Sequence, residues 1–220
     1  MMVYIHWNNN ICMVLKKRVL IVGCGGIGSN VVDALYRACH ALQLPCTINV
    51  MDGDIVSSTN LGHQRFQSTD IGQTKVSVIE RRYNEEGSLV NVIGIEDDLI
   101  DKEQLIGYDF IIVAVDRPEP RRMVHQQEAP WIDLRCSGDG FMVLTYQTDK
   151  NLVEAMTPNH PPKSCQLEGA LDIGNIEFGF LISAAHGAQW ALQHLRGFSG
   201  PHESIGSITS GSFQFPVVSQ

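Results

Sequence analysis

The residues with the clearest chemical potential in this 220-residue chain are four closely spaced glycines, Gly23, Gly25, Gly26 and Gly28. A short apolar run at 19–22 precedes them, and residues 29–44 have the composition of a helix. A glycine turn between a strand and a helix lets the backbone approach a phosphate, and the unpaired amides of the first helical turn attract its negative charge. The segment therefore predicts a nucleotide-phosphate cradle, although a tight packing turn would use the same glycines.

Two carboxylates follow at positions that suit such a site. Asp52 comes after a β-rich run at 47–51, about 20 residues beyond the glycines, where this kind of fold places its acceptor for the ribose hydroxyls. Asp54 either joins it or supports the loop, and a simple Asp-Gly-Asp turn is the alternative for both. Asp116 ends the apolar run at 110–115, where an oxygen ligand beside phosphates suits Mg²⁺. A helix N-cap is the alternative interpretation of Asp116.

Lysine and cysteine side chains lie in or beside long aperiodic segments. Residues 57–73 are polar without helical or strand periodicity, and loops of this length are usually functional. Lys75 then begins an amphipathic helix, where the helix dipole gives a lysine no advantage, which favours a ligand role. Cys165 lies in the predicted loop 149–169 and is either a nucleophile or an inert thiol. Arg121, shortly after Asp116, is expected to face either solvent or phosphate.

The elements that must position these residues alternate between strand and helix. Apolar runs predict strands at 19–22, 47–51, 90–95, 110–115, 131–135 and 141–146, with a hairpin turn at 137–140 and a long helix at 178–195. This order predicts an α/β, Rossmann-like, mostly parallel sheet with helices on both faces and an antiparallel C-terminal extension. We expect an N-terminal arm or strand at 1–15, a nucleotide-binding domain at 16–200, and a tail or edge strand at 201–220, with the strand at 213–218.

Net charge, apolar runs and cysteine spacing exclude several classes of protein. The formal net charge is −8 and the sequence pI is about 5.4, which argues against broad binding to nucleic acid or to an anionic membrane. No apolar run is long enough to cross a bilayer, and the N-terminus lacks the pattern of a signal peptide. The six cysteines form no Cys-x-x-Cys pair, so no structural zinc is expected. A cytoplasmic protein with reduced thiols is the simplest expectation.

Several ordered motifs together resemble one superfamily. They are the glycine turn at 23–28, Asp-Gly-Asp at 52–54, Asn-Leu-Gly-His-Gln at 60–64, Asp-Ile-Gly-Gln-Thr-Lys at 70–75, and Asp116 with Arg121 behind it. From about residue 18 to about residue 197, the chain resembles the ThiF/MoeB/HesA superfamily of ubiquitin-activating-enzyme-like adenylyltransferases. In motif spelling it is similar to the compact ThiF proteins of the PRTRC type.

This resemblance implies an activity. Such enzymes bind ATP and Mg²⁺ and adenylate the C-terminal glycine of a small ubiquitin-like or sulfur-carrier protein ending in Gly-Gly, and they generally form homodimers. The resemblance implies that the glycine turn, with Ile27, holds the nucleotide and that Asp52 takes the ribose. It further assigns phosphate contacts to Asn60, Gln64 and Lys75, Mg²⁺ to Asp116, and thioester or persulfide chemistry to Cys165.

The sequence departs from the superfamily pattern in three ways, and these departures bear on catalytic activity more than on the fold. His63 stands where the family usually has an arginine that holds the triphosphate, and Arg65 is the candidate substitute. The usual N-terminal arginine segment and the zinc-binding cysteine pairs are absent. Two alternatives therefore accompany the adenylyltransferase: a catalytically weakened relative that binds nucleotide or a partner, and an NAD-dependent oxidoreductase. A hydride-transfer enzyme would have no need of Lys75 and a metal ligand at the phosphates.

Overall fold

An eight-stranded sheet forms the centre of the protein, in the order β10-β9-β8-β7-β6-β3-β4-β5. The computed structural model describes residues 2–7, 10–162, 164–167 and 169–216. Strands β5-β4-β3-β6-β7 pair in parallel, and β8, β9 and β10 continue the sheet antiparallel. The predicted fold class is thereby confirmed. The strands are β3 (Lys17–Val22), β4 (Cys46–Met51), β5 (Val90–Ile95), β6 (Phe110–Val113), β7 (Trp131–Ser137), β8 (Gly140–Thr145), β9 (Ser204–Ser207) and β10 (Gly211–Phe213).

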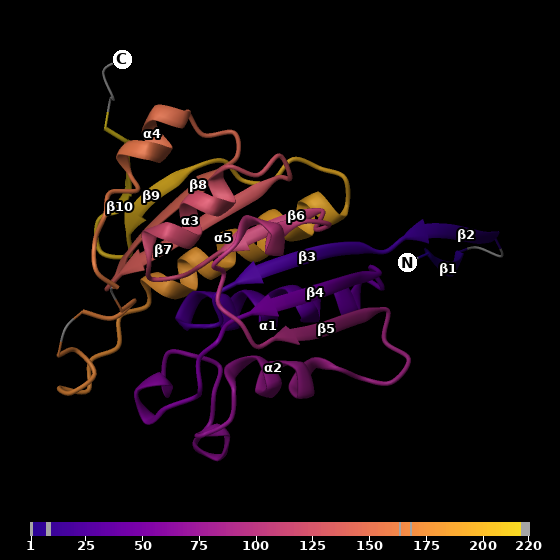
Figure 1. Cartoon of the computed structure of the whole chain (residues 1–220), viewed down its shortest axis with the longest axis horizontal. Helices are drawn as coiled ribbons and strands as arrows, with labels where there is room; N and C mark the ends of the chain where they lie inside the picture. The colour runs from indigo at the N-terminus through magenta and orange to yellow at the C-terminus, as the bar shows by residue number, and fades with distance from the viewer. Residues whose placement is uncertain (1, 8–9, 163, 168, 217–220) are drawn as a thin grey trace.

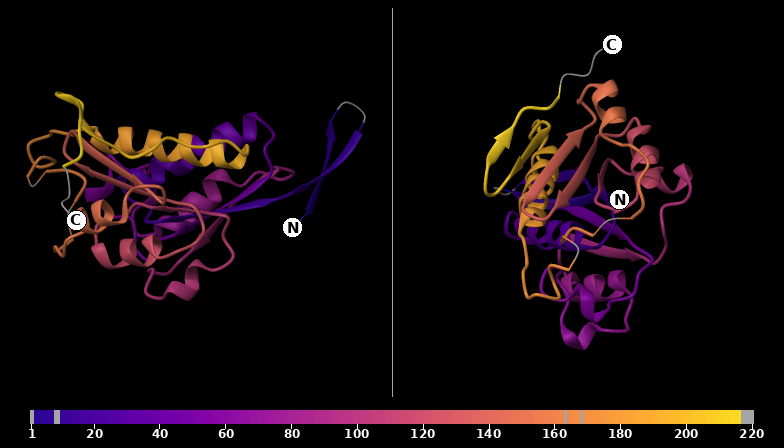
Figure 2. Two further views of the ribbon diagram at one scale, coloured as in Figure 1. Left: turned by 90° about the horizontal axis from the view of Figure 1, so that it is seen from above. Right: turned by 90° about the vertical axis from the view of Figure 1, so that its left-hand side faces the viewer.

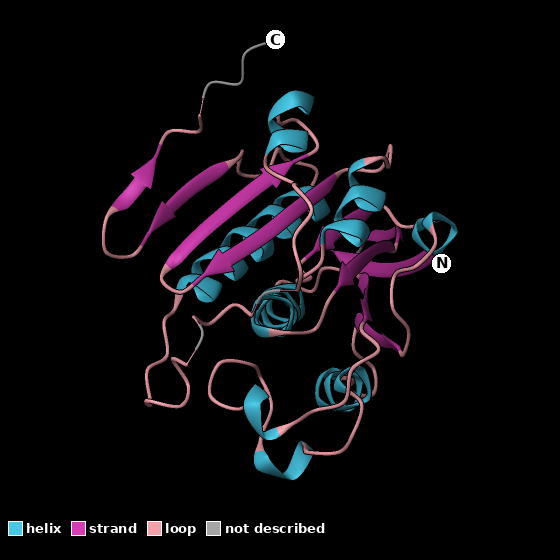
Figure 3. Cartoon of the chain, turned by 60° about the vertical axis from the view of Figure 1, so that its left-hand side comes forward, coloured by secondary structure: helices cyan, strands magenta, loops and turns pink. Residues whose placement is uncertain are grey.

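Helices cover both faces of the sheet, as Figures 1 and 3 show. Side chains of alternate residues leave a strand on opposite faces, so Ile21 of β3 packs in one core and Leu20 in the other. The first core is closed by α1 (Gly26–Ala41), α2 (Lys75–Tyr83) and α5 (Gly179–Leu195). The second is closed by α3 (Pro118–His125), α4 (Lys150–Ala155) and the 3₁₀ turn η3 (Lys102–Leu105).

The strand order reverses at β3, and this reversal creates the place for a ligand. From β3 the chain passes through α1 to β4 on one side, whereas β6 pairs with β3 on the other. The loops that leave the carboxyl ends of β3 and β6 therefore diverge and leave a crevice between them. The glycine turn follows β3, Asp52 follows β4, and Asp116 lies beyond β6.

The structure corrects several expected elements. Strand β6 ends at Val113, two residues earlier than expected, although the Ala114 amide still donates to the Val22 carbonyl. The expected loop 149–169 contains α4, because the Asp149 carboxylate caps it by accepting from the amides of Asn151 and Leu152. The aperiodic segment 57–73 holds two 3₁₀ turns, η1 (Ser58–Asn60) and η2 (Ser68–Asp70).

The two ends of the chain differ in how they join the sheet. Strands β1 (Met2–Trp7) and β2 (Asn10–Leu15) pair antiparallel in a separate two-stranded sheet, which projects from the rest of the chain in Figure 2. At the other end, the expected edge strand 213–218 is replaced by β9 and β10, which begin earlier, and residues 217–218 lie outside the described part. None of the helices in the described residues is both long and apolar enough to span a bilayer.

Candidate active site

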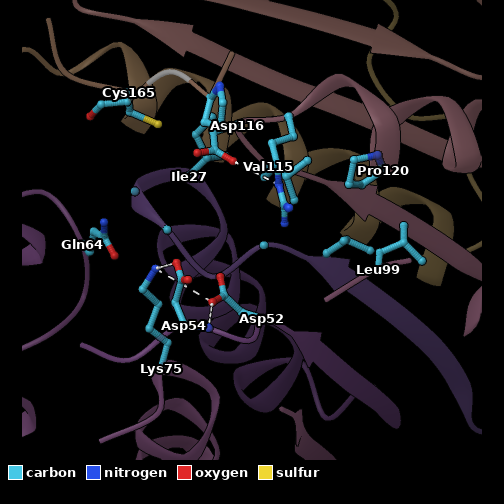
Figure 4. Close-up of a pocket in the computed structure, with 18 of the residues that line it drawn as sticks. Ile27, Asp52, Asp54, Gln64, Lys75, Leu99, Val115, Asp116, Pro120 and Cys165 are labelled. Atoms are coloured by element: carbon cyan, nitrogen blue, oxygen red, sulfur yellow. Dashed lines mark hydrogen bonds and ion pairs between the residues drawn. The ribbon is translucent and has the colours of Figure 1, made fainter. Parts of the chain in front are cut away.

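A cavity of about 690 Å³ opens at the strand reversal and takes in nearly all of the predicted site residues. Its size is in the usual range for a small-molecule site. The predicted residues that line it are Gly23, Gly25, Gly26, Ile27, Asp52, Asp54, Asn60, His63, Gln64, Lys75, Asp116 and Cys165. Gly28 and Arg65 are not among its lining residues. Figure 4 shows Lys75 directed toward Asp52 and Asp54, with Asp116 and Cys165 across the cavity.

The glycine turn is shaped by two close approaches of the backbone. Gly23 has a φ of +94°, and a Cβ there would lie 2.6 Å from the Ala114 carbonyl oxygen of the neighbouring strand end. A Cβ at Gly28 would overlap the carbonyl oxygen of Gly23. A Cβ at Gly25, in contrast, would meet nothing within 4 Å, and Gly25 lines the cavity. Gly23 and Gly28 therefore build the turn, while Gly25 leaves room for a ligand at the first amides of α1.

Asp52 is tied to the glycine turn by backbone amides. Its side chain accepts hydrogen bonds from the Cys24 amide at 2.6 Å and from the Asp54 amide at 2.9 Å. Burial raises the pKa of Asp52 above its ordinary value, opposed by the nearby Lys75 ammonium and by these amides. The carboxylate is thus held in a fixed orientation at the cavity wall, as a hydroxyl-binding group must be.

Lys75 is the buried cation of the site, with a side chain only 6% exposed. Its Nζ lies 2.6 Å from Asp54 and 3.9 Å from Asp52. Burial alone would lower the pKa of Lys75, but these two carboxylates outweigh it and raise that pKa above the ordinary value. The ammonium is therefore charged at neutral pH, and because the Asp54 side chain is 71% exposed, a phosphate entering the cavity could take its place.

His63 and Gln64 line the cavity, and each has a buried polar atom without a hydrogen-bond partner among the described residues. The Gln64 Oε1 and His63 Nδ1 atoms are buried and make no hydrogen bond of ordinary geometry, while Gln64 Nε2 lies 3.3 Å from His63 Nε2. Burial lowers the pKa of His63, so the ring is neutral at neutral pH. Buried polar atoms without partners are rare in proteins, and here they indicate that a polar ligand completes the site.

Asn60 and Arg65 are engaged within the protein. The Asn60 Oδ1 atom accepts from the Ser57 amide, so its NH₂ group is what it can offer a ligand. The Arg65 guanidinium points to α1, where it donates to Asn30 Oδ1 at 2.8 Å and pairs with Asp33 at 3.2 Å. In this arrangement Arg65 does not face the cavity, and a phosphate contact would require it to leave both partners.

Asp116 has the chemistry of a magnesium ligand. Its side chain is 52% exposed, lines the cavity, and has a 4.0 Å contact with Arg117. In the described part of the chain, no group of three or more His, Cys, Asp or Glu side chains converges on one point. A cation beside Asp116 would therefore need phosphate oxygens and water as its other ligands, which is the usual way in which Mg²⁺ is bound. The residues present fit that ion.

Arg121 is among the residues that line the cavity, and its guanidinium is engaged within the protein rather than exposed to solvent. It is buried and forms a hydrogen-bonded ion pair with Asp133 of β7, while its second terminal nitrogen donates to the Val115 carbonyl. Asp133 is 0% exposed and also pairs with Arg135 and His125. The sequence carries no signal for this cluster, because Asp133 lies inside an apolar strand and its partners come from two different elements, α3 and β7.

Some lining residues were not predicted. Asp97, Asp98 and Arg117 line the cavity, with Arg117 paired to Asp98 at 3.1 Å, and Cys136 and His160 line it as well. Asp97 and Asp98 follow β5, so the rule that found Asp52 and Asp116 at strand ends could have found them as well. His160 lies in a loop, where the sequence carries no pattern that would have marked it.

Comparison with known proteins identifies the family of this arrangement. The ThiF family profile matches residues 10–214, which is most of the chain. The protein belongs to the ThiF family. Among solved structures, E. coli MccB, solved with ATP, superposes with a TM-score of 0.67 at 20% sequence identity, covering 90% of this chain and 64% of MccB. At that identity the likeness establishes a shared fold.

Curated relatives share part of the ThiF chain. The NEDD8-activating enzyme E1 catalytic subunit of Arabidopsis thaliana is 32% identical over 111 residues, which are 49% of this chain and 23% of the relative. The ATP-dependent ubiquitin transferase-like protein Cap2 of Escherichia coli is 30% identical over 108 residues, 47% of this chain and 18% of the relative. The matched segment thus spans less than a quarter of each of these two relatives.

Proposed function

We propose that this ThiF-family protein is an ATP-dependent adenylyltransferase that activates the C-terminal glycine carboxylate of a small ubiquitin-like or sulfur-carrier protein. The observation that carries the proposal is the convergence of the open Gly25 position, the fixed Asp52 carboxylate, the buried Lys75 ammonium and Asp116 around one cavity. Together they supply a phosphate cradle, a hydroxyl acceptor, a cation and a metal ligand. Magnesium at Asp116 would neutralise phosphate charge.

The reaction requires two anions to meet. A carrier carboxylate oxygen attacks the α-phosphorus of ATP, the bond from that phosphorus to the pyrophosphate oxygen breaks, and pyrophosphate leaves. Catalysis of such a step rests on positioning and on neutralising charge. The Gly25 and Gly26 backbone at the start of α1 would face the phosphates, and Lys75 would exchange its contact with Asp54 for one with a phosphate oxygen.

Cys165 is the proposed nucleophile of a subsequent transfer. It lies against the start of α1, where a Cβ placed on Gly26 would be 3.7 Å from its sulfur. An acyl group activated in the cavity would therefore form within reach of the sulfur. Attack of the thiolate on the carbonyl carbon would release AMP and leave a thioester. A persulfide on the same sulfur would give the corresponding acyl disulfide.

The test is ATP–pyrophosphate exchange by the purified full-length protein, with the probe being small proteins that end in Gly-Gly and are encoded beside its gene. We expect exchange with one of these small proteins. We expect no exchange when that small protein lacks its final glycine. Absence of exchange with every probe, together with absence of ATP binding, would exclude the proposal.

A catalytically weakened nucleotide-binding relative is the second candidate, and the buried, neutral His63 favours it because it brings no positive charge to the phosphates. His63→Arg separates the two. A gain in exchange would support a weakened enzyme, whereas a loss would show that the imidazole has acquired its own role. An NAD-dependent oxidoreductase is less well supported, since neither Lys75 nor Asp116 serves hydride transfer.

We also propose a cytoplasmic location, which the dispersed cysteines predict, and a homodimer, which the family resemblance implies. Phe178, the N-cap residue of α5, and Leu181 in its first turn are 49% and 40% exposed, and Ala185 continues the exposed apolar face. We propose no nucleic-acid or membrane partner, in keeping with the negative net charge.

A further inference from the structure

Two cysteines meet at the edge of the cavity and suggest a chemistry that adenylation does not need. Cys136 is near the end of β7, and its sulfur lies 3.9 Å from the carbonyl oxygen of Cys165. The Gly138 amide donates to that same carbonyl at 3.0 Å, which fixes the segment carrying Cys165 against the β7–β8 turn. Both cysteine residues are partly rather than fully buried, and both line the cavity. A small oxidant in solution can therefore reach them.

A buried positive charge lies behind this pair. Arg121 and Arg135 share one carboxylate, Asp133, so two guanidinium charges face one negative charge. Burial and the neighbouring Arg135 lower the pKa of Arg121 to about 9, which leaves it charged at neutral pH. Burial lowers the pKa of Arg135 to about 10, with the same result. The cluster of Arg121, Arg135 and Asp133 thus carries a net positive charge, and a thiolate beside it would be stabilised.

The pKa values of the Cys165 and Cys136 thiols are shifted in opposite directions. A hydrogen bond from the Cys136 thiol lowers the pKa of Cys165 below its ordinary value despite burial, aided by the Arg121 charge and the Ile27 amide. Donation of that hydrogen bond, with burial, raises the pKa of Cys136. Cys165 is therefore the attacking thiolate, and Cys136 holds the proton.

We propose that Cys165 and Cys136 form a reversible thiol–disulfide site, with Cys165 attacking small-molecule disulfides and Cys136 resolving the mixed disulfide. In the first step the Cys165 thiolate attacks one sulfur of the oxidant, the oxidant's S–S bond breaks, and one thiolate leaves. In the second step Cys136 gives its proton to solvent and attacks the Cys165 sulfur, expelling the second thiolate. The two protein thiols lose two electrons in all, and the oxidant disulfide is reduced to two thiols.

The second step is favoured by the first. Once Cys165 carries a mixed disulfide, it has no negative charge and no longer accepts the hydrogen bond from Cys136. The Arg121 charge then stabilises a thiolate at Cys136 instead. If Cys165 is the nucleophile of the proposed transfer, which rests on the proposed function, the disulfide withdraws it from that step.

A second cysteine pair, buried in the core, serves as a control for the accessibility of Cys136 and Cys165. Cys39 of α1 and Cys46 of β4 are also neighbours, and the hydrogen bond between them raises the pKa of Cys46. Both are 0% exposed within the apolar core. They provide a second close pair that an oxidant in solution cannot reach.

The experiment treats the full-length protein with oxidised glutathione, followed by intact-mass measurement and non-reducing peptide mapping. We expect the wild type to lose two hydrogens and to yield a Cys136–Cys165 cross-linked peptide, both reversed by dithiothreitol. Cys136→Ser should stop at a stable glutathione adduct on Cys165, Cys165→Ser should give neither product, and Cys39→Ser should behave as the wild type.

Two results would overturn the proposal: a wild-type protein that retains glutathione on Cys165 without forming the cross-linked peptide, or one that does not react at either cysteine. Circular dichroism of each variant confirms folding. The readout needs neither ATP nor a carrier, so its failure would leave the adenylation proposal intact, and failure of adenylation would leave this one intact.

Discussion

Asp116 can be tested without disturbing the fold, because its side chain is 52% exposed and its one ion pair within the described residues is a 4.0 Å contact with Arg117. Asp116→Asn removes the negative charge that would hold Mg²⁺. We expect the gain in ATP affinity on adding Mg²⁺ to fall about tenfold, with an unchanged melting temperature. Calorimetric titration of ATP with and without Mg²⁺ measures this gain.

The matched control is Asp98→Asn, which removes a carboxylate of similar exposure from the cavity rim on the β5 side. It should keep the response to Mg²⁺. An equal loss in both variants would mean that the overall negative charge of the cavity, rather than Asp116, governs metal dependence.

His125 predicts how stability depends on pH. Burial and the charges of Arg135, Arg121 and Arg122 lower its pKa to about 3 in the folded protein. The unfolded chain has an ordinary histidine pKa of about 6.5 and takes up the proton first as pH falls. The neutral ring therefore contributes stability that is present above pH 6.5 and is lost as pH falls toward 3.

We expect the free energy of unfolding to drop by about 2 kcal/mol between pH 7 and pH 5 from this group. His125→Gln keeps a hydrogen-bond donor for Asp133 without a titratable ring, so it should lack that part of the drop. Urea unfolding of both proteins at the two pH values gives the difference. Parallel losses in the two proteins would contradict the assignment to His125.

In the unit formed by β3, the glycine turn and α1, two nearby glycines have different roles: Gly28 is needed for the fold, and Gly25 leaves space for a ligand. Gly28→Ala would drive a Cβ into the Gly23 carbonyl, and we expect a loss of about 3 kcal/mol in the free energy of unfolding. Gly25→Ala meets no atom within 4 Å and should cost less than about 1 kcal/mol, yet its methyl group enters the cavity.

Chemical denaturation and ATP titration of both variants check this contrast. Gly25→Ala should bind ATP at least tenfold more weakly while remaining folded, because its methyl group occupies the space that a phosphate needs. Unchanged ATP affinity in Gly25→Ala would place the nucleotide elsewhere in the cavity.

The site could be predicted from the sequence where the controlling interactions are local. Asp52 and Asp116 follow apolar runs directly, and strands that pair in parallel bring such positions to one edge. The buried position of Arg121 could not be predicted, because it depends on contact between α3 and Asp133 on the following strand β7. Helix α4 had a local signal in the Asp149 cap, but its short length and the prolines that follow favoured a loop.

At the scale of the whole molecule, the exposed apolar face of α5 predicts self-association. Light scattering coupled to size exclusion should give a mass twice that of the 24.4 kDa chain. Leu181→Glu, which places a charge on that face, should shift the protein toward the monomer. A wild-type monomer at micromolar concentration would refute the proposed dimer.

We propose that the cavity at the strand reversal is an ATP site. Its most direct test is calorimetric titration of the purified protein with ATP and Mg²⁺, alongside the same titration with NAD⁺. We expect saturable binding of one ATP per chain, weakened at least tenfold in Gly25→Ala, and no comparable binding of NAD⁺. Absence of ATP binding, or preferential binding of NAD⁺, would contradict it.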